Sequence, residues 1–188
     1  MFFLRKSSLE LLPVAMSGVR MGERALQIGI DDASLAGAIA AKVGLSGSAA
    51  MIVADEGIAV KARSAASKAG ALVDVQIASL QSLPFESDSF DAIVVHAMSG
   101  LLSSMDQTAR VAMLREGYRV LRTGGRIVVI ETGARSGLAA LLRPQGGDEA
   151  YASGGGAVAA LTTAGFRSPR VLAEREGYRF TEGLKTEP

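Results

Sequence analysis

Short runs of apolar residues alternate along this chain with segments in which apolar residues recur every three or four positions. A short apolar run bounded by turn residues is typical of a buried strand, whereas the longer spacing places apolar side chains on one face of a helix. Strands are therefore predicted at residues 24–30, 49–55, 73–77, 90–96 and 126–130. Helices are predicted at residues 35–43, 58–69 and 157–164.

Two further runs, 169–174 and 178–182, flank Gly177 and predict a closing antiparallel hairpin. The five earlier strands are nearly all apolar and alternate with helices, as in a parallel sheet buried on both faces. We therefore predict an α/β fold that is Rossmann-like and doubly wound, with a mostly parallel seven-stranded sheet and a C-terminal antiparallel hairpin. The length of 188 residues favours a single domain over residues 1–188.

One more helix precedes the fifth strand, and polar and glycine residues mark its expected ends. Ser103 or Ser104 is predicted to cap its N-terminus, its apolar positions continue to Leu121, and Gly124-Gly125 is predicted to end it. Residues 132–156 contain seven glycines and little periodicity. That segment is therefore predicted to be the most mobile internal part of the chain.

Composition excludes several classes of function. The 20 Lys and Arg residues nearly balance the 19 Asp and Glu residues, which argues against a nucleic-acid partner. With no Cys and one His, disulfides, thiolate chemistry and multi-histidine metal sites are excluded, and no metal is expected. No run approaches the ~20 apolar residues of a membrane span. The N-terminus is apolar before it is basic, opposite to a secretory signal, so a cytoplasmic location is expected.

Three stretches follow a pattern more specific than this alternation. Residues 83–91 read LPFESDSFD, residues 118–126 read YRVLRTGGR, and residues 164–166 read AGF before the predicted hairpin. Together they resemble the class I S-adenosylmethionine-dependent methyltransferases, above all the small-molecule group that includes the ubiquinone and menaquinone biosynthesis methyltransferases. The resemblance covers roughly residues 21–185. It implies the fold predicted above and S-adenosylmethionine as the cofactor to consider.

The resemblance also implies where that cofactor would bind. The family holds it in a glycine-rich loop after the first strand, with the pattern V-L-D-x-G-x-G-x-G, because glycines let the backbone approach the methionine part. Residues 25–33 of this chain read ALQIGIDDA. Gly29 is retained, but Gln27 replaces the acid that helps to hold the cofactor's amino group. Asp31 and Ala33 replace glycines, so the loop is degenerate.

Two interpretations of the acidic pair in this loop are open. Asp31 or Asp32 can cap the helix that starts near Ser34, which contributes about 1 kcal/mol. Asp31 can also contact an altered ligand. If its carboxylate came within ~4 Å of the cofactor's own carboxylate, repulsion at an effective dielectric of ~20 would cost about 4 kcal/mol. Asp31 therefore predicts weak binding of S-adenosylmethionine in the family manner.

Two further acids of the family pattern are displaced or replaced. The acid that binds the ribose at the end of the second strand aligns with Val53, and Asp55 serves in its place only with a two-residue shift. As an alternative role, Asp55 begins the following helix. The acid that contacts the adenine aligns with Ser79, which accepts hydrogen bonds more weakly than a carboxylate. The candidate cofactor-binding residues are thus Gln27, Gly29, Asp31, Asp55 and Ser79.

A catalytic candidate stands at the end of the fourth predicted strand. His96 is the one side chain whose ordinary pKa lies near neutrality, and open α/β sheets place ligands at the carboxyl ends of their strands. The alternative interpretation is a buried histidine with a structural role. Glu131, which ends the fifth strand, is a weaker candidate of the same kind.

Three functions follow in order of preference. The first is a methyltransferase-fold protein with a degenerate cofactor site that is weakly active or non-catalytic, and that binds another small molecule or a protein partner. The second is an active small-molecule methyltransferase that uses S-adenosylmethionine. The third, a dinucleotide oxidoreductase, lacks the G-x-G-x-x-G motif after the first strand. A homo-oligomer is compatible with all three.

Overall fold

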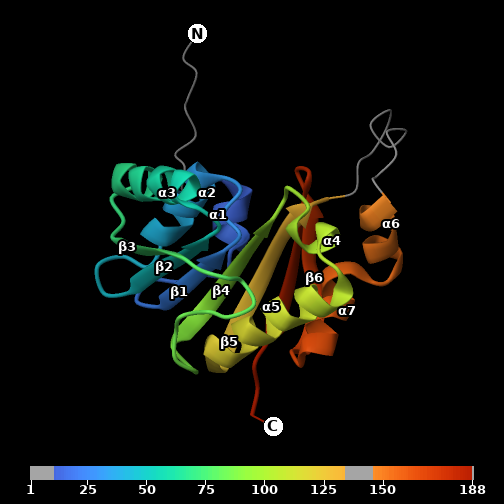
Figure 1. Ribbon diagram of the computed structural model, residues 1–188. Coiled ribbons are helices and arrows are strands. Elements are labelled where there is room, and N and C mark those ends of the chain that lie inside the picture. The colour runs from blue at the N-terminus through green and yellow to red at the C-terminus, as the bar shows by residue number, and fades with distance from the viewer. Residues whose placement is uncertain (1–10, 134–145, 188) are drawn as a thin grey trace.

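The computed structural model in Figure 1 describes residues 11–133 and 146–187. About half of the segment for which mobility was predicted, residues 134–145 of 132–156, lies outside the described residues. In its described part, residues Gly146–Ser153 form a helix, α6, that the sequence pattern did not predict. The mobility of the segment stays a prediction.

Seven strands form one sheet with the order β3-β2-β1-β4-β5-β7-β6. Their bounds are β1 Arg24–Ile28, β2 Ser48–Val53, β3 Val73–Ile77, β4 Phe90–Ala97, β5 Leu121–Thr132, β6 Arg167–Arg175 and β7 Tyr178–Leu184. The first five pair in parallel, and β7 runs antiparallel to both β5 and β6. Glu176 and Gly177, both with positive φ, make the two-residue turn of the final hairpin. The predicted fold class is confirmed.

Helices cover both faces of this sheet, as Figure 1 shows. The remaining bounds are α1 Leu12–Met16, α2 Ala33–Ala41, α3 Glu56–Lys68, α4 Leu101–Ser104, α5 Gln107–Val120 and α7 Gly156–Ala164. Side chains alternate along each strand, so Met51 and Val94 pack under α1, α2 and α3, while Ile52 and Ile93 pack under α4, α5 and α7. The chain therefore buries two hydrophobic layers, one on each face of the sheet.

Both predicted ends of the long helix before β5 were wrong. Asp106, rather than Ser103 or Ser104, caps α5 by accepting a hydrogen bond from the Ala109 amide at 2.8 Å. The two serine hydroxyls instead donate to carbonyls three residues earlier. At the other end the helix stops at Val120, and Leu121 already pairs with Phe90 in the sheet. The backbone of Gly124 and Gly125 forms hydrogen bonds with Lys185, so these glycines belong to β5 and do not end the helix.

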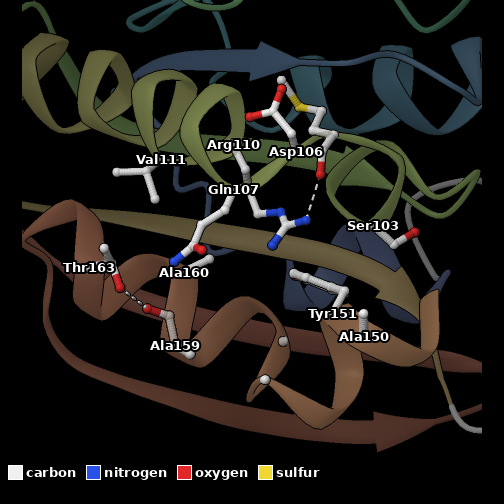
Figure 2. A pocket seen from close by; sticks show the side chains of 13 residues that line it. Ser103, Asp106, Gln107, Arg110, Val111, Ala150, Tyr151, Ala159, Ala160 and Thr163 are labelled. Atoms are coloured by element: carbon white, nitrogen blue, oxygen red, sulfur yellow. Dashed lines mark hydrogen bonds between the residues drawn. The ribbon is translucent and has the colours of Figure 1, made fainter. Parts of the chain in front are cut away.

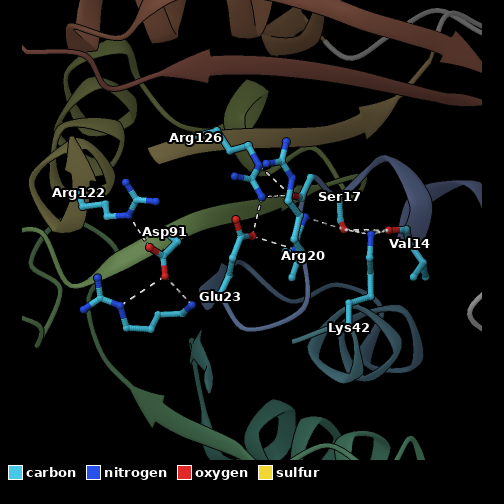
Figure 3. Close-up of polar contacts among 11 residues, drawn as sticks. Val14, Ser17, Arg20, Glu23, Lys42, Asp91, Arg122 and Arg126 are labelled. Atoms are coloured by element: carbon cyan, nitrogen blue, oxygen red, sulfur yellow. Dashed lines mark hydrogen bonds and ion pairs between the residues drawn. The ribbon is translucent and has the colours of Figure 1, made fainter. Parts of the chain in front are cut away.

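Ion pairs fasten the amino ends of the parallel strands (Figure 3). Asp91 at the start of β4 accepts hydrogen bonds from the backbone and side chain of Arg24 and from Arg122. Burial alone would raise the pKa of Asp91, but these hydrogen bonds outweigh it and hold that pKa below its usual value. Arg126 binds the Gly18 carbonyl and the Glu23 carboxylate. The opposite, carboxyl edge of the sheet is thus the edge left for a ligand site.

Candidate functional site

The candidate site lies between β1 and β4, where the order of the strands in the sheet reverses. The chain runs from β1 outward to β2 and β3, then returns to place β4 on the other side of β1. Ligands of open α/β sheets bind at such a switch point, beyond the carboxyl ends of the strands. The loop after β1, with Gly29 and Asp31, and the end of β4, with His96, meet there.

Gly29 lies in a position that excludes any side chain. Its φ is +73°, in the left-handed region that favours glycine. A Cβ built on it would lie 2.4 Å from the Cδ2 of Leu101 and 3.0 Å from the carbonyl oxygen of His96. Leu101, the first residue of α4, therefore covers the one glycine of the loop that the sequence retains.

The two aspartates of the loop have different partners. Asp32 caps α2, because its Oδ1 accepts a hydrogen bond from the Leu35 amide at 3.0 Å. Asp31 reaches across to the loop after β4, where its Oδ2 accepts from the Ser99 amide at 2.9 Å. Of the two possible caps, the structure thus assigns Asp32. Asp31 and Leu101 together join the β1 loop to the segment that follows β4.

Gln27 is fully buried, and neighbouring groups use both ends of its amide. Its Nε2 donates to the Ala36 carbonyl at 2.9 Å, and its Oε1 lies 2.9 Å from the Nε2 of His96. Since the Gln27 oxygen can only accept, the His96 Nε2 carries the proton in this pair. Gln27 therefore ties β1 to both α2 and β4.

His96 is also fully buried, and only one of its two ring nitrogens has a hydrogen-bond partner among the described residues. Nδ1 has no hydrogen-bond partner among the described residues, and it lies 3.8 Å from the Oδ1 of Asp31. Burial lowers the pKa of His96 to about 4, against the opposing influence of Asp31 and Asp32. The imidazole is thus neutral at pH 7, with its Nδ1 lone pair turned towards a carboxylate.

The other two cofactor candidates do not join this cluster through any hydrogen bond. Val53, the last residue of β2, is buried, and Asp55 is exposed and caps α3 by accepting from the Ile58 amide at 2.9 Å. Ser79 follows β3, is exposed, and accepts from the Gln81 amide at 3.2 Å. Each therefore already has a local structural partner.

Glu131, the residue before the last of β5, contacts Tyr151, which lines a pocket that the sequence did not indicate. Figure 2 shows the residues that line this pocket. The Tyr151 hydroxyl donates to the Glu131 Oε1 at 2.9 Å, and burial raises the pKa of both Glu131 and Tyr151. The guanidinium of Arg110 lies 4.5 Å from the centre of the Tyr151 ring. The pocket has a volume of about 370 Å³ and lies among α4, α5, α6 and α7.

Sequence reasoning missed Leu101, Arg110 and Tyr151. Leu101 follows Ser99-Gly100, which marks a turn but does not indicate what the next side chain covers. Arg110 follows the polar residues Gln107 and Thr108, so its helix face resembles a solvent-exposed one. Tyr151 lies in the glycine-rich segment, for which no helix was predicted. No spacing rule connects Arg110 with Tyr151, because the two meet only when α5 and α6 come together in the folded chain. Likewise, Leu101 comes close to Gly29 only when the segment after β4 packs against the loop after β1.

Two classes of site find no support in the described part of the chain. Within residues 11–133 and 146–187, no cluster of three or more His, Asp or Glu residues is arranged to hold a metal ion. Over the same residues, each helix is too short or too polar to cross a lipid bilayer.

The strand order, the antiparallel β7 and the loop at the β1–β4 switch point define a class I methyltransferase fold of the S-adenosylmethionine-dependent type. A family described as a methyltransferase domain matches residues 26–129, more than half of the chain. The chain therefore belongs to this methyltransferase domain family, and the resemblance stated from the sequence is confirmed.

Individual relatives agree with this assignment. The chain is similar to a ubiquinone/menaquinone biosynthesis C-methyltransferase UbiE from Chromobacterium violaceum, with 30% identity over 115 residues. That match covers 61% of this chain and 45% of the relative, so the chain spans less than half the length of the relative. Among solved structures, an S-adenosylmethionine-dependent methyltransferase from Aquifex aeolicus superposes with a TM-score of 0.69 at 20% identity, over 95% of this chain and 92% of that one. The [4+2]-cyclase SpnF superposes with a TM-score of 0.65 at 18% identity, over 94% and 80% of the two chains.

Proposed function

We propose that this chain is a methyltransferase-family protein whose glycine loop holds S-adenosylmethionine weakly or not at all. In this proposal the protein works by binding another small molecule or a protein partner rather than by methyl transfer. The dissociation constant for S-adenosylmethionine is expected to lie above roughly 100 µM, which corresponds to a binding free energy of about −5.5 kcal/mol.

The single observation that carries this proposal is the position of Leu101 over Gly29. In the family the loop glycines let the methionine part of the cofactor lie against the backbone. Here the Cδ2 of Leu101 lies 2.4 Å from where a Cβ on Gly29 would stand, which supports a loop closed to the cofactor. For the cofactor to enter, Leu101 must turn away and its apolar contact with the loop must be lost.

The polar groups of the loop support the same proposal. The amide of Gln27 stands where the family has an acid, and its two ends are occupied by Ala36 and His96. Asp31 holds the Ser99 amide, and its carboxylate would repel the carboxylate of the cofactor. In this arrangement the described residues do not fit the methionine part of S-adenosylmethionine.

Another function is compatible with the fold, because the [4+2]-cyclase SpnF superposes on this chain. Function depends on the site rather than on the fold that carries it. The runner-up proposal, an active small-molecule methyltransferase, rests on the family match over residues 26–129, which includes the glycine loop. It requires the segment at Ser99 and Leu101 to open when the cofactor arrives.

Titration calorimetry separates these two proposals. The full chain is titrated with S-adenosylmethionine and, separately, with its demethylated product, S-adenosylhomocysteine. Binding of both weaker than roughly 100 µM supports the occluded loop. A dissociation constant of about 10 µM or below for either compound would overturn the proposal and favour the active methyltransferase. A thermal unfolding scan with each compound gives an independent readout, since a ligand that binds the native state raises Tm.

A further inference from the structure

We propose that the pocket among α4, α5, α6 and α7 binds a small aromatic carboxylate, with Arg110 as the residue that holds the carboxylate. This site is separate from the glycine loop, and the inference stands whether or not that loop binds S-adenosylmethionine. Its main features are a fixed guanidinium and a wall of small apolar side chains.

The size of the pocket suits a small organic molecule. Its volume of about 370 Å³ lies in the range of ligand pockets, roughly 300–1,000 Å³. Figure 2 shows Arg110 and Gln107 entering it from α5, opposite Ala159 and Ala160 of α7, with Tyr151 of α6 at one side. The pocket is thus lined by residues of α4, α5, α6 and α7.

Arg110 is held in place before any ligand arrives. Its Nε donates to the Leu102 carbonyl and its Nη2 to the Met105 carbonyl, both at 2.6 Å. The flat guanidinium also stacks on the Tyr151 ring at 4.5 Å. Within the described part of the chain, its Nη1 has no hydrogen-bond partner. A donor fixed in this way loses little side-chain entropy on binding, which favours capture of a planar carboxylate.

The charged groups around the pocket indicate where a ligand carboxylate would bind. Arg110 is the one basic side chain among the residues that line it, and Asp106 is the one acidic side chain. The Asp106 carboxylate caps α5 through the Ala109 amide, and Glu131 accepts a hydrogen bond from the Tyr151 hydroxyl. The guanidinium of Arg110 is therefore the group that we expect a ligand carboxylate to contact.

The wall opposite Arg110 favours a flat apolar ring. Ala159, Ala160 and Gly156 of α7 project little beyond the backbone, and Val111 adds an apolar surface from α5. A ring lying against this wall buries apolar area and places a carboxylate substituent at the guanidinium. A phosphate or sulfate lacks the ring and would lose that contribution, so an aromatic carboxylate is the favoured class.

The probe for this site is 2-naphthoate, titrated into the full chain by calorimetry or by ligand-observed NMR. The neutral analogue 2-naphthamide tests the contribution of the charge. We expect saturable naphthoate binding that is at least tenfold tighter than binding of the amide. Arg110→Gln should weaken naphthoate binding at least tenfold. Arg115→Gln, the matched loss of an exposed arginine on the same helix, should leave it unchanged.

A second variant keeps the inference testable if Arg110→Gln does not fold, since Arg110 also supports two carbonyls. Gln107→Glu places a negative charge in the lining of the pocket, and a glutamate in the first turn of α5 is compatible with the helix. It should weaken naphthoate at least threefold and leave naphthamide unaffected. The inference is overturned by an absence of saturable naphthoate binding, or by an affinity that responds to neither Arg110→Gln nor Gln107→Glu. Because the probe is not S-adenosylmethionine, neither result depends on the outcome at the glycine loop.

Discussion

The Nε2 of His96 donates a hydrogen bond to the Oε1 of Gln27 at 2.9 Å, although 69 residues separate the two along the chain. Both side chains are fully buried at the β1–β4 switch point, where a methyltransferase of this family has an acid on β1. The pair braces β1 against β4 inside the protein. In our proposal this contact and the Asp31–Ser99 hydrogen bond keep the loop after β1 from receiving the cofactor.

Removal of this brace should destabilise the protein. Gln27→Met keeps the side-chain volume, but it leaves the His96 Nε2 proton without its partner and removes the side-chain donor to the Ala36 carbonyl. We expect the free energy of unfolding to fall by about 2–3 kcal/mol, the usual consequence of leaving buried polar groups unpaired. Urea unfolding gives the value, and Gln107→Met, on an exposed helix position, is the control. A loss below about 0.5 kcal/mol would mean that the pair contributes little.

Acid should destabilise the fold through His96. The pKa of His96 is about 4 in the folded chain against an ordinary value of 6.5, so the unfolded chain binds the additional proton. Stability is therefore lost as the pH falls from about 6.5 towards 4. Between pH 7 and pH 5 the expected loss is about 2 kcal/mol.

The measurement is urea unfolding at pH 7, 6 and 5 for the wild type and for His96→Gln. The variant should have lower stability but a flatter dependence on pH over this range, because it lacks the titrating group. The acidic groups Asp91 and Glu116 have lowered pKa values, so they lose their stabilising effect mainly below this range. Burial raises the pKa of Glu131, which acts in the opposite direction in both proteins, so the difference between the wild type and His96→Gln isolates the effect of His96. A wild type that gains stability relative to the variant towards pH 5 would indicate a charged His96 paired with Asp31 instead.

Truncation of the side chain over the glycine loop should improve cofactor binding. Leu101→Ala removes the atoms that cover Gly29 and should raise the affinity for S-adenosylmethionine at least tenfold, about 1.4 kcal/mol. The loss of a half-buried leucine should reduce stability by about 1–2 kcal/mol. Calorimetry measures the affinity, and Met105→Ala, a truncation outside the loop, should leave it unchanged. Equal affinity in wild type and Leu101→Ala would place the obstacle elsewhere.

Gly29 itself should tolerate no substitution. Gly29→Ala introduces a left-handed non-glycine residue and a close contact with Leu101, so we expect a loss of about 2–4 kcal/mol in unfolding free energy. In the double variant Gly29→Ala/Leu101→Ala the close contact between the two side chains should be relieved. The stability losses of the two single variants should therefore add up to about 1 kcal/mol more than the loss measured for the double variant. Strict additivity would mean that Leu101 does not press on this position.

The cap of α5 offers a test of the corrected helix start. Asp106→Ala removes the acceptor of the Ala109 amide and should reduce stability by about 1 kcal/mol. Ser104→Ala, at the position predicted from the sequence, should change it by less than about 0.5 kcal/mol. Thermal or urea unfolding distinguishes the two, and the reverse order of effects would restore the serine cap.

The sequence by itself determined the class of fold. Its apolar runs and helical spacings located every strand of the sheet, and the turn at Gly177 placed the antiparallel hairpin. These features follow from periodicity because each strand and helix must bury one or both faces. The family was also readable, since the motifs at 83–91 and 118–126 are contiguous. The candidate residues Gly29, Asp31 and His96 were located correctly at the carboxyl edge of the sheet.

The partners of those residues were decided by the tertiary structure alone. Nothing in the local sequence links Gln27 to His96, Asp31 to the Ser99 amide, or Leu101 to Gly29. The same holds for α5, which ended at Val120 because Leu121 found a strand partner in Phe90. Such contacts join residues that are distant along the chain, and their geometry depends on how β4 and its following loop pack against β1. Periodicity records which face of an element is buried, whereas only packing decides which atoms meet there.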